Sequence, residues 1–274
     1  MKNNYYERLL KYVDDIRKIT DFEPEIAIVL GSGLGNFANL IDVVAEVNYK
    51  ELEGFPFSTA PGHEGKFIFG TVAGKKVVCM KGRIHYYEGY EMCDVVLPMR
   101  VMHLLGAQSA IITNAVGCMN PDFKVGSFMA VNDCIASFVP SPLIGPNIDE
   151  LGVRFPDMTE LYSREYIDII KEIGKEENID VNEGVFIQLT GPQYETASEI
   201  RFYKAMGADC AGMSSAVEAI AAHHMGMKVA EICCITNMST GISATKLTEE
   251  EVLEIAGQVS GKFETLVKKL VERI

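Results

Sequence analysis

Two side chains that can carry positive charge stand two residues apart in the segment GRIHYYEGY, residues 82–90. Arg83 and His85 would share one face at the end of a strand, because alternate side chains of a strand point the same way. A guanidinium matches the geometry of phosphate, and an imidazole can donate a hydrogen bond or carry a proton near neutral pH. Glu88 is close enough in sequence to orient that imidazole. The pattern indicates an anion site; the alternative is a solvated Arg–Glu pair beside a structural histidine.

A glycine-rich turn follows an apolar run in the stretch AIVLGSGLG, residues 27–35. Exposed backbone amides together with the Ser32 hydroxyl suit an anion. The G-x-G-x-x-G dinucleotide fingerprint fails because Asn36 occupies its third glycine position, and Asn36-Phe37 also fails the P-loop pattern. The alternative is a tight turn in which the glycines only relieve steric crowding.

Three further segments combine glycine with polar side chains. GPQYETASE offers Tyr194 and Glu195 before a predicted helix, and GMSSAVE offers Ser214. Helix capping and the helix dipole would explain these residues without any ligand. His63 lies in the glycine-flanked loop APGHEGK, where a solvated histidine is the alternative.

Short apolar runs alternate with amphipathic segments, a pattern that predicts a mixed α/β fold. Strands are predicted at 25–31, 67–72, 75–80, 109–117, 184–191 and 228–237, and helices near 3–19, 92–106, 163–178, 196–206 and 215–226. Thr248 and Glu251 form a capping box before a last helix with helical apolar spacing to Ile274. Several strands end in small or polar clusters, and ligands of open α/β sheets bind at the carboxyl ends of strands. We therefore expect one pocket there.

Composition excludes several classes of function. The 274 residues include 25 Lys and Arg against 38 Asp and Glu, a net charge of −13, which argues against a nucleic-acid binder. No apolar run approaches a membrane span, and the first residues lack the pattern of a signal peptide. The seven cysteines contain no Cys-x-x-Cys pair, so we expect reduced thiols, a cytoplasmic location and no metal site.

The motifs together resemble those of the trimeric class of purine nucleoside phosphorylases. The segments that carry the resemblance run in order from Leu30 to Asn237: LGSGLG, PGHEG, KGRIHYYEGY, TNAVG, PLIGPN, VRFPDMTELYS, GPQYET, GMSS and ITN. The resemblance implies one α/β domain over residues 1–274, with a mixed central β-sheet flanked by helices, assembled as a homotrimer. It also implies phosphorolysis of a purine nucleoside to the free base and ribose 1-phosphate, with inorganic phosphate as co-substrate and no metal or organic cofactor.

The resemblance also assigns site residues. Phosphate would be held by Ser32, Arg83, His85, the backbone of Ala115 and Ser214. The nucleoside would be contacted by Tyr87, Met213, Tyr194, Glu195 and Asn237, by Phe155 from a neighbouring subunit, and by His63 on a mobile loop. The expected catalytic residues are His85, Glu195 and Asn237.

Two positions set the expected specificity. Asn237 would face the 6-oxo group and N7 of hypoxanthine or guanine, whereas related methylthioadenosine phosphorylases carry Asp there. Inosine and guanosine, as ribosides or 2′-deoxyribosides, are therefore the expected substrates, and adenosine a poor one. Glu249 occupies a position where the family usually has a histidine that contacts the ribose 5′-hydroxyl, so we expect an altered 5′ preference.

Four alternatives stay open at this level. They are a methylthioadenosine-type phosphorylase, a phosphate-independent nucleoside hydrolase, a dinucleotide-dependent oxidoreductase, and a purine-binding protein without catalysis. Dependence of nucleoside cleavage on phosphate would distinguish either type of phosphorylase from the hydrolase, the oxidoreductase and the binding protein.

Overall fold

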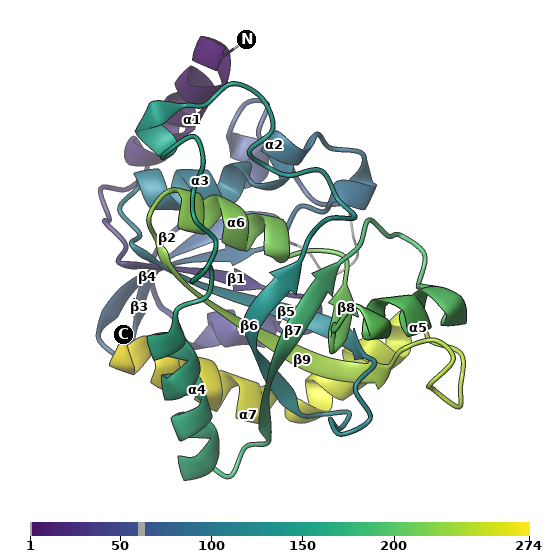
Figure 1. Cartoon of the computed structure of the whole chain (residues 1–274). Helices are drawn as coiled ribbons and strands as arrows, with labels where there is room; N and C mark the ends of the chain where they lie inside the picture. Colours follow the sequence, from purple (N-terminus) through teal and green to yellow (C-terminus); the bar gives the residue numbers. More distant parts are fainter. Residues whose placement is uncertain (1, 60–63) are drawn as a thin grey trace.

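A mixed β-sheet forms the centre of the molecule in the computed structural model, which describes residues 2–59 and 64–274 (Figure 1). Its strands in that part of the chain are β1 (Ile26–Leu30), β2 (Asp42–Asn48), β3 (Lys66–Val72), β4 (Lys75–Lys81), β5 (Ser109–Cys118), β6 (Phe128–Ile135), β7 (Val181–Gln188), β8 (Cys210–Gly212) and β9 (Lys228–Met238). The strand order is β2-β3-β4-β1-β5-β8-β7-β6-β9, and β5 also pairs with β9. Strands β5, β8, β7, β6 and β9 therefore close into a ring.

The directions of the strands decide where a site can form. Strand β1 is parallel to both β4 and β5, and β5 is parallel to β9. The segments that follow β1, β4 and β9 therefore leave the sheet at the same edge, beside the end of β5. All five residues of β1 are buried, as expected for a parallel strand covered on both faces.

Helices cover both faces of the sheet (Figure 1). The α-helices described are α1 (Lys2–Arg17), α2 (Met92–Val95), α3 (Leu97–Leu104), α4 (Arg164–Glu176), α5 (Ala197–Ala205), α6 (Ala216–His224) and α7 (Glu249–Arg273), and the 3-10 helices are η1 (Gly35–Leu40), η2 (Tyr49–Glu51), η3 (Tyr86–Glu88) and η4 (Asp149–Leu151). Helices α1, α3 and α6 pack together on one face, and α4 and α7 pack together on the other. The expected fold class is confirmed.

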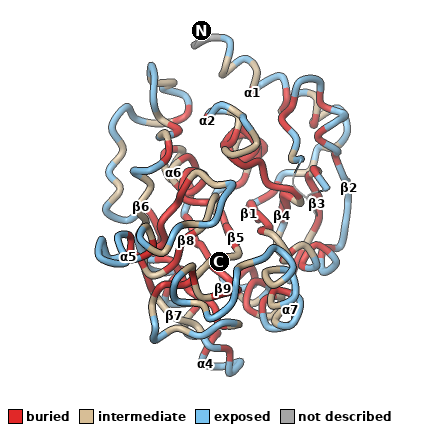
Figure 2. Tube along the Cα trace, turned by 90° about the vertical axis from the view of Figure 1, so that its right-hand side faces the viewer, coloured by how far each residue is buried: buried red, intermediate tan, exposed pale blue. Residues whose placement is uncertain are grey.

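The last helix shows how sequence pattern becomes packing. Thr248 caps α7, because its hydroxyl accepts the backbone N–H of Glu251 at 3.2 Å. Phe263, Leu266 and Leu270 are buried against the core, while the opposite face of α7 is exposed (Figure 2). The cap and the buried stripe agree with the sequence pattern. Only half of the predicted capping box is present in the described residues, because the Glu251 side chain does not accept the backbone N–H of Thr248.

One predicted helix is divided. Residues 92–106 form the short helix α2 and then α3, with the break at Val96. Pro98 lies in the first turn of α3, where its missing N–H costs nothing. In the described residues, no helix has the length and apolarity needed to cross a membrane.

Candidate active site

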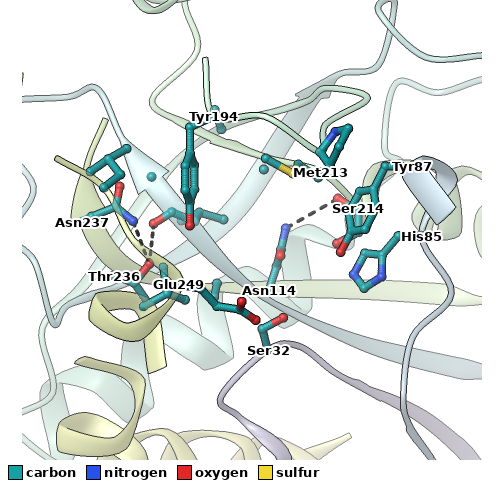
Figure 3. Close-up of a pocket in the computed structure, with 18 of the residues that line it drawn as sticks. Ser32, His85, Tyr87, Asn114, Tyr194, Met213, Ser214, Thr236, Asn237 and Glu249 are labelled. Atoms are coloured by element: carbon teal, nitrogen blue, oxygen red, sulfur yellow. Dashed lines mark hydrogen bonds between the residues drawn. The ribbon is translucent and has the colours of Figure 1, made fainter. Parts of the chain in front are cut away.

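A cavity of about 520 Å³ opens at the sheet edge where β1, β4, β5 and β9 end. Most of the residues expected to form a site line it: Ser32, Arg83, His85, Tyr87, Ala115, Tyr194, Glu195, Met213, Ser214 and Asn237. Figure 3 shows Asn237 on one side of the cavity and Ser214, Tyr87 and His85 on the other, with Tyr194 between them. A cavity of this size fits a nucleoside-sized ligand.

The glycine turn after β1 brings Ser32 to the cavity. A Cβ atom on Gly31 would lie 2.9 Å from the carbonyl oxygen of Thr113, so β1 and β5 approach too closely for a side chain there. Gly33 has a φ of +73°, and a Cβ on it would lie 2.7 Å from Cβ of Ala256 in α7. Gly31 is therefore required by close packing, and Gly33 by close packing and backbone conformation. The alternative reading, a tight turn in which glycine only relieves steric crowding, explains Gly31 and Gly33. It does not explain why Ser32 lines the cavity.

Arg83 is fixed from two directions behind this turn. Its side chain is 1% exposed, its Nη1 donates to Oγ of Ser214 at 3.1 Å, and its Nε lies 2.8 Å from a carboxylate oxygen of Glu218 in α6. Burial raises the pKa of Glu218, and the Arg83 charge opposes that rise. A buried guanidinium held in this way is pre-positioned for an anion, because little side-chain freedom remains to be lost on binding.

His85 is oriented by Glu88, and the two residues belong to one turn. Nδ1 of His85 lies 3.1 Å from Oε1 of Glu88, and the other carboxylate oxygen of Glu88 accepts the backbone N–H of Thr59. Burial raises the pKa of Glu88, but hydrogen bonds from His85 and Thr59 outweigh it and hold the pKa at about 2. An ionised carboxylate only accepts, so Nδ1 of His85 carries the hydrogen. Burial lowers the pKa of His85, so the ring is neutral at pH 7 before a ligand binds.

The end of the cavity opposite Ser214 and His85 carries an amide group (Figure 3). Asn237, at the end of β9, is 4% exposed, and its Nδ2 donates to Oγ1 of Thr236 at 3.2 Å. Within the described residues, Oδ1 of Asn237 is buried without a hydrogen-bond partner. Burial raises the pKa of Glu195, which also lines the cavity. An unsatisfied buried acceptor is costly, so this end is suited to a ligand that donates a hydrogen bond.

Comparison with known proteins agrees with this geometry. The family model of the phosphorylase superfamily matches residues 25–272. Purine nucleoside phosphorylase 1 of Geobacillus stearothermophilus is 44% identical over 92% of this chain and 92% of its own length. The chain belongs to the purine nucleoside phosphorylase family.

Solved structures of the purine nucleoside phosphorylase family share the whole fold. The crystal structure of the Schistosoma mansoni enzyme in complex with adenosine has a TM-score of 0.92 and 36% identity, covering 98% of this chain and 97% of that one. Its structure in complex with inosine has a TM-score of 0.91 and 35% identity, covering 98% and 96%. The family resemblance seen in the ordered motifs is confirmed.

One described residue that the family resemblance assigned to the site, Phe155, does not line the cavity. Phe155 is 85% exposed and is not among the lining residues, although Arg154 lies over its ring at 4.9 Å. His63 lies outside the described residues. A residue that reaches a neighbouring subunit would be exposed in this way in one protomer.

Other lining residues of this purine nucleoside phosphorylase site were not expected from the sequence. Asn114 on β5 lines the cavity and donates from Nδ2 to Oγ of Ser215 at 3.0 Å. It lies next to Ala115, of which only the backbone was expected to act; a polar residue inside an apolar strand was the available signal. Val252 and Leu253 of α7 add an apolar wall.

Glu249, the first residue of α7, also lines the cavity. Burial, Glu88 and then Glu249 raise the pKa of Tyr87 to about 12. Burial followed by the charge of Glu249 raises the pKa of Tyr194 as well. Glu249 therefore gives the region between the two tyrosines a negative potential.

Proposed function

We propose that the protein catalyses phosphorolysis of 6-oxopurine ribonucleosides and 2′-deoxyribonucleosides, such as inosine and guanosine, to the free base and (deoxy)ribose 1-phosphate. One observation carries the proposal: side chains suited to an anion, among them His85 and Ser214, lie at one end of a cavity and the amide of Asn237 lies at the other, and Glu195 also lines this cavity (Figure 3). A nucleoside between them would present C1′ to the anion and its base to the amide.

Phosphate is the nucleophile in this proposal, so no protein base is needed to activate it. Ser32, Arg83 and Ser214 would hold its oxygens with the backbone of Ala115, and His85 would add a further hydrogen bond. Each charge-assisted hydrogen bond contributes about 1.5–3 kcal/mol. Holding the anion beneath C1′ replaces a bimolecular encounter by a positioned attack, which is the main contribution of these residues.

The leaving base acquires negative charge as the glycosidic bond breaks. Asn237 would donate from its amide toward N7, where this charge accumulates, and accept at Oδ1 from a protonated group of the base. Glu195, when ionised, would accept from N1–H of hypoxanthine or guanine and from the guanine amino group. The orphaned Oδ1 of Asn237 supports this assignment.

The sugar would lie between the two ends. Tyr87 stacks on His85, with ring centroids 4.7 Å apart and planes 15° from parallel, so it is placed beside the phosphate end. Met213, which lies beside Tyr87 against Gly191, and Tyr194 would cover the ribose and base. Glu249 would accept a hydrogen bond from the 5′-hydroxyl, and its charge would disfavour a 5′-phosphate.

The proposal requires neither a metal nor an organic cofactor, because phosphate supplies the nucleophile and hydrogen bonds stabilise the leaving group. It takes the whole chain, residues 1–274, as one domain. Seven free cysteines, most of them buried, support a reducing compartment such as the cytoplasm.

A homotrimer completes the proposal. The segment before α4 exposes Ile144, Val153 and Phe155, an apolar group that a monomer would leave in water. Contact with a neighbouring subunit would bury these side chains and bring Phe155 to the neighbour's cavity.

Ultraviolet monitoring of inosine with xanthine oxidase as coupling enzyme tests the function. Hypoxanthine should form only when phosphate is present, and EDTA should not change the rate. Release without phosphate would indicate the nucleoside hydrolase. Efficient cleavage of methylthioadenosine with little cleavage of inosine would indicate the methylthioadenosine-type enzyme.

A further inference from the structure

Glu231, on β9, is a buried carboxyl group that the proposed reaction does not use. Glu231 is only 1% exposed. Oε1 accepts from Oγ of Ser215 at 2.5 Å, and Oε2 accepts from the hydroxyl of Tyr162 at 2.8 Å. The bond to Ser215 places Glu231 directly behind the proposed phosphate end of the cavity, because Ser215 follows Ser214, which lines that end.

Ser215 has a backbone conformation that requires support. Its φ of 85° and ψ of −49° lie in a region that non-glycine residues rarely adopt. Its hydroxyl oxygen contacts Nδ2 of Asn114, the carbonyl oxygen of Ser214 and Glu231. These contacts hold the turn that presents Ser214 to Arg83 and to the cavity. A strained turn maintained by a buried network at a binding site points to a positioning role.

The hydroxyl of Ser215 has one hydrogen and two acceptors within reach. When Glu231 is ionised, that hydrogen goes to Oε1 of Glu231. When Glu231 carries a proton, its own O–H donates to Oγ of Ser215, and the Ser215 hydrogen goes to the carbonyl oxygen of Ser214. The protonation of Glu231 therefore selects between two hydrogen-bond arrangements of the Ser214–Ser215 turn.

Charge in this region is balanced only in part. The ionisable groups that face Glu231 are Arg83 after β4, Glu218 on α6, Tyr162 before α4, Cys134 on β6 and Cys233 on β9 itself. Burial raises the pKa of Glu231 to about 7, against the lowering effects of Ser215, Tyr162 and Arg83. Arg83 is the cation among these five described groups, and Glu218 is its direct partner. An added dianion at Arg83 would further favour the protonated carboxyl group.

We propose that Glu231 is a positioning residue of the phosphate subsite, fixing the Ser214–Ser215 turn through Ser215 and taking up a proton when a dianion binds beside Arg83. The proposal rests on the phosphate subsite of the proposed function. The proposal fixes the direction in which dianion affinity changes with pH. As pH rises through the pKa of Glu231, the carboxyl group loses its proton, negative charge appears next to the subsite, and the affinity for a dianion falls.

Sulfate binding measured by titration calorimetry tests the proposal. Sulfate stays a dianion between about pH 6 and 8.5, whereas phosphate itself titrates there. The wild type should lose roughly three- to tenfold more sulfate affinity over this range than Glu231→Gln, whose neutral amide can still donate to Ser215. The same titrations repeated in buffers of different ionisation enthalpy measure the protons taken up on binding. Near neutral pH the wild type should take up about half a proton more per sulfate than Glu231→Gln. His85 contributes equally in both proteins, so the difference reports Glu231.

Two further variants make the result specific. Glu165→Gln, which removes an exposed carboxylate from α4, should behave as the wild type. Tyr162→Phe removes a hydrogen bond that lowers the pKa of Glu231, so its loss of sulfate affinity should move to higher pH. This shift tests the proposal even when Glu231→Gln does not fold, and an unshifted profile overturns it.

The remaining outcomes separate this proposal from the proposed function. Sulfate binding with the same pH profile in the wild type and in Glu231→Gln overturns the role of Glu231 alone. Weaker binding by a constant factor at every pH also overturns it, because that result indicates a purely structural residue. No sulfate binding by the wild type overturns the phosphate subsite itself, and this proposal with it.

Discussion

One carboxylate oxygen of Glu88 accepts hydrogen bonds from both the backbone and the ring of His85. Oε1 lies 2.8 Å from the backbone nitrogen of His85 and 3.1 Å from Nδ1. The other oxygen accepts from the backbone and the hydroxyl of Thr59. Glu88 thereby ties the segment before β3 to the turn that carries His85.

Replacing Glu88 by Gln should raise the KM for phosphate by roughly tenfold, because an imidazole loses orientation and basicity when its carboxylate partner is removed. Steady-state kinetics with phosphate as the varied substrate measures the effect. Glu91→Gln, three residues away and exposed, is the matched control. An unchanged phosphate KM in the Glu88 variant would show that His85 does not depend on this contact.

Glu88 should also make stability depend on pH. Its pKa is lowered to about 2, so the stabilisation from its ionised form is fully present above its unfolded pKa of about 4.3. It is lost as pH falls from there through the folded pKa. The difference in Tm between the wild type and Glu88→Gln should therefore be larger at neutral pH than near pH 3. A difference that grows on acidification would contradict the assignment.

Asn237→Asp should erode the preference for 6-oxopurines, because a carboxylate accepts from the 6-amino group of adenine and repels a 6-oxo group. The ratio of kcat/KM for inosine to that for adenosine should fall by at least about tenfold. The ratio of kcat/KM values is the right measure, because it reports the discrimination between the two substrates in the transition state. An unchanged ratio would mean that Asn237 does not read the base.

Phe155→Ala should raise the KM for the nucleoside by about tenfold, because in the proposed trimer this exposed ring covers the cavity of the neighbouring subunit. Light scattering of the wild type and the variant checks that both form the proposed trimer. Val44→Ala, which truncates an exposed apolar side chain on β2, is the control. If the nucleoside KM does not change, Phe155 does not reach a neighbouring cavity.

The predicted strands with long apolar runs are all present, because such strands can be recognised from the local sequence alone. Strand β8 has three residues, too few for any periodic signal. Strand β2 has apolar residues at the alternate positions Val43, Ala45 and Val47, but it lies at the edge of the sheet and exposes most of its residues, and it is not among the predicted strands. Strand β6 turns from buried to exposed along its length. The pairing of β5 with both β8 and β9 closes the ring, and it joins residues about a hundred positions apart that no local pattern connects.

The candidate site was predictable where a motif carried a reactive side chain. Arg83, His85 and Ser32 belong to motifs whose residue types suit an anion, the family resemblance assigned them to one site, and they line one cavity. Glu218 and Glu231 gave no comparable signal, because a carboxylate within a helix or strand reads as a surface residue. Their roles depend on burial beside Arg83, which only the three-dimensional packing creates.

A crystal soaked with sulfate or phosphate tests the central claim most directly. The account predicts one oxyanion in contact with the hydroxyl of Ser32, the guanidinium of Arg83 and the hydroxyl of Ser214, on the same side of the cavity as His85. Density for the anion elsewhere, with none beside these three side chains at saturating concentration, would contradict it.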